Sequence, residues 1–212
     1  MNHAFKNLII VDNPLVKRDI TILRDKTTPT FEFRHSLNRI AYCLAVEISK
    51  LFKIKSVQVE TPLEETEGFL IDEKIVLVPV LRAGLSLVQS FLEIIPIADV
   101  GHIGLERNEK TLEPRDYYYK TPSDLENSKV IVLDPMLATG GSADAAFTSL
   151  KKKGAKDCIL ACLIAAPEGV ARIEREHPEI PIFTATLDRC LNNVGYILPG
   201  LGDAGDRTFG TL

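Results

Sequence analysis

Residues 130–142 combine the residue types of an anion-binding loop. They read VIVLDPMLATGGS, an apolar run that ends in an acid and is followed by small residues. Residues 139–141 can turn their backbone N–H groups inward, and a helix that begins there would add its aligned dipoles. The Thr139 and Ser142 hydroxyls can donate to phosphate oxygens, while Asp134 can reach sugar hydroxyls. The pattern predicts a site for a phosphorylated sugar, although Thr-Gly-Gly alone is more often a plain turn.

A second loop of the same design contains an arginine. Residues 78–84 read VPVLRAG, so an apolar run again leads into a short loop. Arg82 could bind an anion through two parallel hydrogen bonds. The alternative is a surface ion pair, worth about 0–1 kcal/mol, which would not need Ala-Gly beside it. Together with Arg107, two anion loops at the carboxyl ends of strands in one sheet could hold both phosphorylated ends of one substrate.

The C-terminal residues 195–210 are unusually rich in glycine, with five in sixteen. Such a composition is typical of a flexible tail. Its apolar residues need burial, however, so the glycines more plausibly allow tight turns whose backbone faces a ligand. Backbone groups at Ile197, Gly202 and Ala204 could match the donors and acceptors on the edge of a flat heterocycle such as uracil.

The elements that must position these loops follow from hydrophobic periodicity. Residues 34–52 carry the apolar stripe of an amphipathic helix. Short apolar runs predict strands buried on both faces, and helix-sized segments lie between and after them. The predicted strands are 74–79, 129–134 and 158–164, and the predicted helices are 85–93, 142–153 and 169–176. This alternation predicts an α/β fold with a mainly parallel sheet and helices on both faces. Ser142 is the expected N-cap of the middle helix, and Gly154 follows its end.

The segment 106–122 is polar and contains three consecutive tyrosines at 117–119. We expect a mobile hairpin that covers a site and excludes water. The tyrosines could equally pack on the body of the protein or on a partner subunit, or contact a ligand.

Composition narrows the class of protein. The chain has 212 residues, 45% of them hydrophobic, and a formal charge of −4, which fits one globular domain and argues against a general affinity for nucleic acid or anionic lipid. No apolar stretch is long enough for a signal peptide or a membrane span. The cysteines form no CxxC pair and the histidines are scattered, so neither a zinc site nor a disulfide framework is expected; the cysteines are Cys43, Cys158, Cys162 and Cys190. We expect a cytoplasmic protein with reduced thiols.

Taken together, the motifs resemble the bacterial uracil phosphoribosyltransferase family. The distinctive pieces are PVLRAGLSL at 79–87, VGHIGLER at 100–107, TLEPRDYYYKTP at 111–122, DPMLATGGS at 134–142 and GYILPGLGDAGDRTFGT at 195–211. Type I phosphoribosyltransferases usually have two consecutive acids where this chain has Asp134 and Pro135, and that variant is similar to the uracil branch. The resemblance implies the type I phosphoribosyltransferase fold, with a hairpin arm and a C-terminal hood. It implies a single domain over 1–212, with an N-terminal helical segment to about residue 55, a core to about 190 and the hood thereafter.

The implied reaction transfers the 5-phosphoribosyl group from 5-phosphoribosyl-1-diphosphate (PRPP) to N1 of uracil, giving UMP and diphosphate in pyrimidine salvage. Mg²⁺ would be bound mainly through PRPP, without a metal site on the protein. The resemblance assigns catalytic roles to Arg82, Asp134 and Asp203. It assigns PRPP contacts to Arg82, Arg107, Asp134, Pro135, Met136, Leu137, Ala138, Thr139, Gly140, Gly141, Ser142 and Asp203, and uracil contacts to Ile197, Gly202, Asp203 and Ala204.

Two alternative functions stay open from the residues. One is a phosphoribosyltransferase for another base; the other is an RNA-binding regulator of a pyrimidine operon that keeps a PRPP pocket. The latter needs a basic face, and the only basic run, 151–153, is accounted for as a helix C-terminus. The resemblance also implies a homo-oligomer, a dimer or tetramer, and raises GTP as an activator. That regulation is less secure, because Asn13 and His35 stand where the family usually has a histidine and an acid.

Overall fold

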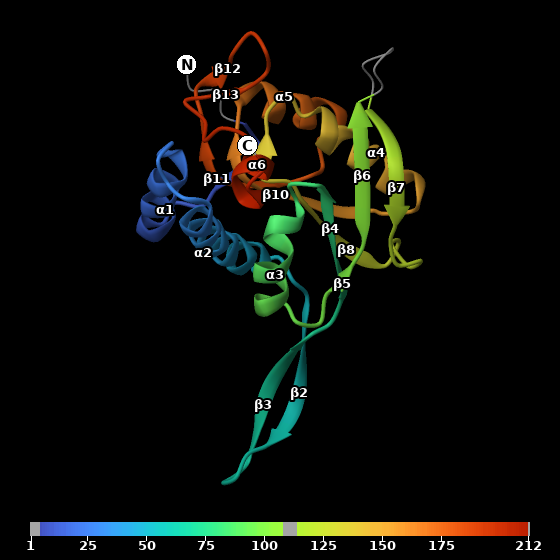
Figure 1. The fold of residues 1–212 in the computed structure, drawn as a ribbon. Coiled ribbons are helices and arrows are strands. Elements are labelled where there is room, and N and C mark those ends of the chain that lie inside the picture. The colour runs from blue at the N-terminus through green and yellow to red at the C-terminus, as the bar shows by residue number, and fades with distance from the viewer. Residues whose placement is uncertain (1–4, 108–113, 212) are drawn as a thin grey trace.

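The structure is a computed structural model that describes residues 5–107 and 114–211, without the side chains of 105–107 and 114–116. Its centre is a nine-stranded sheet in the order β1-β11-β10-β8-β4-β6-β7, with β5 beside β4 and β9 beside β10 (Figure 1). Every pairing in it is parallel except that of β6 with β7. The strands are β1 (Leu8–Ile10), β4 (Lys74–Leu81), β5 (Asp99–Val100), β6 (His102–Arg107), β7 (Pro114–Lys120), β8 (Ser128–Leu133), β9 (Met136–Leu137), β10 (Asp157–Ala165) and β11 (Ile182–Leu187).

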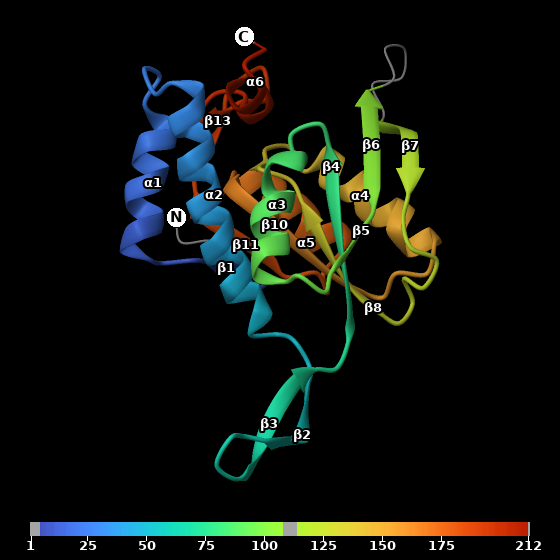
Figure 2. The same cartoon turned by 60° about the horizontal axis from the view of Figure 1, so that its bottom comes forward.

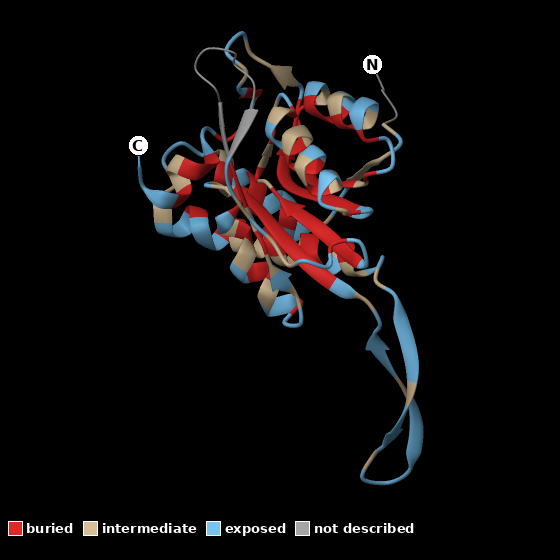
Figure 3. Cartoon of the chain, turned by 90° about the vertical axis from the view of Figure 1, so that its right-hand side faces the viewer, coloured by how far each residue is buried: buried red, intermediate tan, exposed pale blue. Residues whose placement is uncertain are grey.

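Helices cover both faces of this sheet (Figure 2). One face packs against α1 (Pro14–Arg24), α2 (Thr30–Ser49) and α3 (Leu85–Ile94), and the other against α4 (Gly141–Lys152) and α5 (Pro167–Glu176). Alternate residues of a strand serve the two layers: Ile75 and Leu77 join the first core, whereas Val76 and Val78 join the second. Figure 3 shows the buried sheet between helices that are buried on one side only. The expected α/β class, with a mainly parallel sheet, is confirmed.

The predicted N-cap at Ser142 is wrong. The helix α4 begins at Gly141, its N-cap is Gly140, and Gly140 adopts the left-handed backbone conformation with φ 76°. The Gly140 carbonyl already accepts a hydrogen bond from the Asp144 N–H at 2.9 Å. Glycine enters this conformation without a Cβ penalty, so the chain turns into the helix at Gly140 and Ser142 already lies within the first turn.

Two hairpins extend from the sheet layer. The β6–β7 pair forms the expected hairpin, although residues 108–113 lie outside the described structure, and its closure over a site stays a prediction. The ring of Tyr117 packs against the backbone of Gly104, within the same hairpin. The other hairpin, β2 (Ile54–Glu60) and β3 (Glu65–Ile71), projects away from the body as an exposed arm (Figures 1 and 3), and the sequence patterns did not predict it.

The C-terminal segment is anchored to the N-terminal helices. It contains β12 (Cys190–Leu191), β13 (Ile197–Leu198) and α6 (Ala204–Phe209). Arg24 of α1 pairs with Asp188 through both terminal guanidinium nitrogens, at 2.8 and 2.5 Å. Arg207 of α6 donates to the Asp25 carbonyl at 2.7 Å, and its guanidinium lies 4.4 Å from the centre of the Phe33 ring. The glycine-rich end is therefore a packed part of the fold and not a flexible tail.

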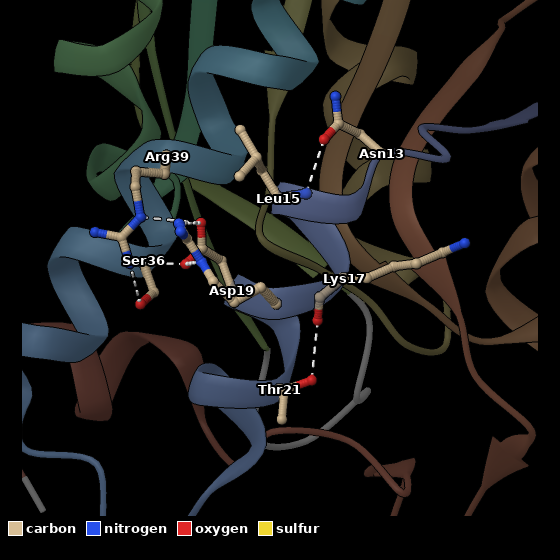
Figure 4. Close-up of polar contacts among 8 residues, drawn as sticks. Asn13, Leu15, Lys17, Asp19, Thr21, Ser36 and Arg39 are labelled. Carbon is tan, nitrogen blue, oxygen red and sulfur yellow. Dashed lines mark hydrogen bonds and ion pairs between the residues drawn. The ribbon is translucent and has the colours of Figure 1, made fainter.

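A buried carboxylate joins α1 to α2 (Figure 4). The Asp19 side chain is 1% exposed and accepts hydrogen bonds from Arg39 at 2.7 and 2.9 Å and from Arg18 at 2.9 and 3.1 Å. Burial alone would raise the pKa of Asp19, but the hydrogen bonds from the two arginines lower it below its ordinary value. The pair fixes the two helices on which the C-terminal segment rests.

We expect Asp19→Asn to lower the free energy of unfolding by about 2 kcal/mol at pH 7, because it leaves Arg39 without its carboxylate partner. The lowered pKa means that the ionised carboxylate stabilises the fold above the pKa of the unfolded chain, about 3.9, and that this contribution is lost as the pH falls through the folded value. Urea unfolding at pH 7 and below pH 4 measures both effects. The control is Asp12→Asn, whose ion pair with Lys17 is exposed; equal losses in the two variants would contradict the role of burial.

The cysteines are free thiols, and Cys158 and Cys162 are buried in β10. Burial raises the pKa of each of these two thiols to about 12, so they stay protonated and unreactive. Among the residues described, no helix combines the length and apolar composition needed to cross a membrane.

Candidate functional site

A cavity of about 270 Å³ lies where the predicted loops meet. Three segments line it: the loop after β4, the loop after β8 and the C-terminal segment. The lining residues are Ala83, Asp134, Met136, Ala138, Ser142, Gly195, Tyr196, Ile197, Gly202, Asp203, Ala204 and Gly205. A larger cavity of about 410 Å³ beside β1 and α1 contains none of the predicted site residues, so we assign the chemistry to the smaller one.

The loop between β8 and α4 contributes Met136, Ala138 and Ser142 to the lining of this cavity. No side chain caps α4, so its first N–H groups are available to a bound anion. Thr139 and Ser142 are exposed, and the Thr139 hydroxyl oxygen accepts a long hydrogen bond of 3.4 Å from the Gly141 N–H. The loop combines backbone donors, hydroxyls and the helix dipole, which is the donor set that a phosphate group requires.

Asp134 lies at the carboxyl end of β8 and lines the cavity. Its Oδ1 accepts a hydrogen bond from the Met136 N–H at 3.3 Å. Burial raises the pKa of this carboxyl to about 6, and the hydrogen bond from Met136 offsets only part of that rise. Above that pH Asp134 is a desolvated carboxylate, which favours hydrogen bonds from the hydroxyls of a ligand.

The loop after β4 packs tightly against the end of β8. A Cβ atom at Gly84 would lie 2.3 Å from the Leu133 carbonyl oxygen, so a larger residue would push the two loops apart. Ala83 lines the cavity, whereas the Arg82 side chain, 56% exposed, lies outside its lining and pairs with Asp206 at 2.9 Å. The Arg82 guanidinium also lies 5.8 Å from the centre of the Phe209 ring. Arg82 is therefore tied to α6 and lies outside the cavity lining.

The C-terminal segment covers the cavity with backbone. Ile197, Gly202, Asp203 and Ala204, the residues to which the resemblance assigns uracil contacts, all line it. Asp203 is also the N-cap of α6, because its Oδ1 accepts a hydrogen bond from the Asp206 N–H at 2.9 Å. We call this segment, residues 191–211, the hood.

The remaining predicted residues divide into three groups. Met136 and Ala138 line the cavity with Asp134 and Ser142, while Thr139, Gly140 and Gly141 belong to the same loop outside the lining. Pro135 and Leu137 are buried, and the Pro135 carbonyl accepts hydrogen bonds from Leu163 and Ile164 of β10. Arg107 ends β6, and its side chain lies outside the described structure.

Sequence reasoning missed several residues of the site. Gly195, Tyr196 and Gly205 line the cavity, and Asp206 holds Arg82. Their only sequence signal is membership of the glycine-rich stretch, which does not reveal which side chains face a ligand. In the part of the chain that the structure describes, no group of three or more His, Cys, Asp or Glu residues could hold a metal ion. Asp134 and Asp203 place two carboxylates on the cavity, which suits a metal ion that takes most of its ligands from a bound substrate.

Comparison with known proteins places the chain among phosphoribosyltransferases. The sequence model of the family "Uracil phosphoribosyltransferase" matches residues 10–211. A uracil phosphoribosyltransferase of Ligilactobacillus salivarius is 51% identical over 203 residues, which cover 95% of this chain and 97% of the relative. A second, from Salinibacter ruber, is 48% identical and covers 97% of this chain and 98% of the relative.

Solved structures agree with these sequence matches. The AQ2163 protein from Aquifex aeolicus has a TM-score of 0.89 and 38% sequence identity, and the match covers 95% of this chain and 97% of that one. A purine phosphoribosyltransferase from Pyrococcus horikoshii has a TM-score of 0.53 at 17% identity, covering 73% of this chain and 84% of that one, and shows a shared fold only.

Proposed function

Since the chain belongs to the uracil phosphoribosyltransferase family, we propose that the cavity beneath the hood is where it brings PRPP and uracil together. The enzyme transfers the 5-phosphoribosyl group of PRPP to N1 of uracil, giving UMP and diphosphate, a reaction of pyrimidine salvage. Relatives at about 50% identity support this activity and neither of the alternatives, another base or an RNA-binding regulator.

One observation supports this location above all others. A single cavity is lined by the phosphate loop, by Ala83 of the Arg82 loop and by the hood. PRPP carries a phosphate on C5 and a diphosphate on C1, the carbon that uracil attacks. Its binding therefore needs surfaces for both phosphorylated ends and for the base around one cavity. We propose that residues 135–142 bind the 5-phosphate, with the N-terminus of α4 facing it, and that Asp134 accepts hydrogen bonds from the ribose hydroxyls.

The charge that develops in the reaction explains the roles we give to the two loops. As the bond to the leaving group lengthens, negative charge collects on diphosphate and positive charge on the ribose ring. Arg82, and Arg107 from the hairpin, would stabilise the diphosphate, while the Asp134 carboxylate would hold the ribose. Mg²⁺ is the proposed cofactor; bound through PRPP beside Asp134 and Asp203, it would supply further charge neutralisation on the diphosphate.

The hood would select uracil through backbone groups. Ile197, Gly202 and Ala204 carry N–H and C=O groups that can pair with the alternating donors and acceptors on the edge of a pyrimidine. Asp203 lines the same cavity, and we propose that it faces the sugar. Holding N1 of uracil over the anomeric carbon makes the attack effectively unimolecular and needs no charged group on the base.

We expect Asp203→Asn to lower kcat about tenfold or more, with a smaller change in the KM for uracil, because it removes the charge beside the reacting sugar. Asparagine caps helices as well as aspartate does, so the hydrogen bond to the Asp206 N–H and the fold should survive. Steady-state kinetics with a melting curve measure both effects. Unchanged kinetics would remove Asp203 from the site.

The activity itself is tested by chromatographic detection of UMP from purified protein, uracil, PRPP and Mg²⁺. The expected product is UMP, with a clear preference for uracil over hypoxanthine, adenine and orotate. Omitting Mg²⁺ tests the cofactor, and initial rates with and without GTP test whether GTP activates this enzyme. Absence of UMP under all these conditions would contradict the proposed function.

We also propose a homo-oligomer, in which the exposed arm contacts a second subunit. A two-stranded hairpin is only marginally stable by itself, yet the arm exposes large apolar side chains, including Leu63 at 95% and Phe69 at 60%. Light scattering after gel filtration should give at least twice the 23.5 kDa of one chain. Phe69→Glu should shift the protein toward the monomer, and a monomeric wild type would contradict this role.

The remaining assignments rest on the family alone. We propose that residues 1–212 form a single phosphoribosyltransferase domain that works in the cytoplasm on small-molecule substrates, without nucleic acid or membrane partners. Fractionation of the source cells tests the location.

A further inference from the structure

A chain of charged side chains joins α4 to α5 behind the phosphate loop. Asp144, in the first turn of α4, receives two hydrogen bonds from Arg172 of α5 at 2.8 and 3.0 Å. Its other carboxylate oxygen lies 2.9 Å from Nε2 of His177, and Nδ1 of His177 lies 2.8 Å from the Lys151 Nζ. Lys151 in turn pairs with Glu179.

We assign the ring hydrogen of His177 to one nitrogen from these contacts. A charged lysine can only donate, so Nδ1 of His177 accepts from Lys151 and the ring hydrogen is on Nε2. That hydrogen is donated to Asp144. The Asp144 carboxylate thus accepts from both Arg172 and His177, and Arg172 is its one charged guanidinium partner among the described contacts.

This network touches the backbone of the phosphate loop. A Cβ atom at Gly140 would lie 3.2 and 3.3 Å from Cδ and Cβ of Arg172, and one at Gly141 would lie 3.5 Å from Nη1. The Arg172 side chain therefore packs directly on the two glycines that precede and begin α4. Ala138 and Ser142 of the same loop line the cavity assigned to PRPP.

The charges in this arrangement oppose one another. An acidic residue in the first turn stabilises a helix, since it faces the positive end of the helix dipole. The same negative charge repels a phosphate bound at that helix end, because the phosphate is also negative. The Asp144 side chain is only 19% exposed, so solvent screens its charge incompletely. A cation held against both Asp144 and the loop removes this conflict.

We propose that Arg172 is a positioning residue for phosphate binding: it neutralises Asp144 beside the phosphate loop and holds the loop backbone, so that α4 keeps its affinity for the 5-phosphate of PRPP. This inference rests on the proposed function, because it names a residue that supports the phosphate end of the same site. Arg172 acts through the loop and through Asp144, and not by contact with the reacting atoms.

The test compares Arg172→Gln with the double variant Arg172→Gln/Asp144→Asn. Glutamine keeps the polar contact with Asp144 but loses the charge. We expect Arg172→Gln to raise the KM for PRPP about five- to tenfold at low ionic strength, with kcat and the KM for uracil within about twofold of the wild type. Added salt should shrink the effect, since Arg172 is accessible to solvent. The double variant should return the KM for PRPP to within about twofold of the wild type, because the uncompensated charge is gone.

Arg175→Gln is the matched control. Arg175 lies on the same helix, pairs with Glu176 and is exposed, so its replacement should leave the KM for PRPP unchanged. A purely structural role of Arg172 predicts the opposite pattern for the double variant, which would then be no better than the single variant and would melt at a lower temperature. That result, or an unchanged KM in Arg172→Gln, overturns the inference. Failure of the wild-type protein to bind PRPP in calorimetry would instead contradict the proposed function.

Discussion

Asparagine in place of Asp134 is expected to remove most of the UMP-forming activity and to make the protein more stable at neutral pH. In our proposal the carboxylate accepts hydrogen bonds from the ribose hydroxyls, so its loss should lower kcat/KM for PRPP about 100-fold. The burial of the Asp134 carboxylate lowers the stability of the folded protein at neutral pH, because burial raises the pKa of this group from 3.8 to about 6. A rise of about two pH units corresponds to at most about 3 kcal/mol, so we expect a gain of about 1–3 kcal/mol from the neutral side chain.

The raised pKa of Asp134 determines whether stability rises or falls with pH. A carboxyl group whose pKa is raised by folding binds more protons in the folded state, so its contribution to stability falls as the pH rises from about 4 to about 6. The wild-type enzyme should lose this stability across that range, whereas Asp134→Asn should not. In the same range the wild-type kcat/KM should decline as the pH falls below about 6, because the carboxyl group becomes protonated. Urea unfolding and initial rates at matched pH values measure both. A variant that is less stable than the wild type at pH 7.5, or fully active, would contradict the account.

Arg82→Ala is expected to lower kcat/KM at least tenfold, equivalent to about 1.4 kcal/mol of transition-state stabilisation, and to leave the fold intact. The guanidinium is the described cation nearest the presumed diphosphate end of the site, where negative charge grows. Its side chain is mostly exposed and its ion pair with Asp206 contributes little to stability. Circular dichroism melting should therefore give nearly the same transition for both proteins.

Asp206→Asn tests whether activity depends on the Arg82 guanidinium itself or on its ion pair with Asp206. This variant breaks the link between Arg82 and α6 but keeps the arginine. If Arg82 served only to hold α6, both substitutions would reduce activity equally. We expect Asp206→Asn to retain most of the turnover and Arg82→Ala to lose it. Wild-type turnover in Arg82→Ala would end the assignment of Arg82 to the diphosphate.

The parts of the fold that could be predicted are those whose signals are local. The strands β4, β8 and β10 are continuous apolar runs because both of their faces are buried, and the helices that follow them begin within a few residues of the predicted positions. The residues of the arm could not be located from sequence patterns, because neither face of β2 or β3 is buried within the chain and hydrophobic alternation carries no information there.

The contacts that hold the hood could not be predicted from the sequence. Arg24 donates to the Gly200 carbonyl at 3.1 Å, and Arg34 donates to the Thr208 carbonyl at 2.6 Å, across more than 160 residues of chain in each case. Nothing in the local sequence distinguishes these arginines from surface ones. The same is true of Arg172, which reaches the phosphate loop from a different helix. The loop itself was predictable because its donors are contiguous in the chain.

The central claim is that one cavity holds both the phosphoribosyl group and the base, and a crystal structure with UMP bound tests it most directly. The account predicts the phosphate of UMP on the backbone N–H groups of residues 139–142, the ribose hydroxyls on Asp134 and the uracil edge on the backbone of Ile197, Gly202 and Ala204. A nucleotide bound elsewhere, or bound with its base away from the hood, would contradict it.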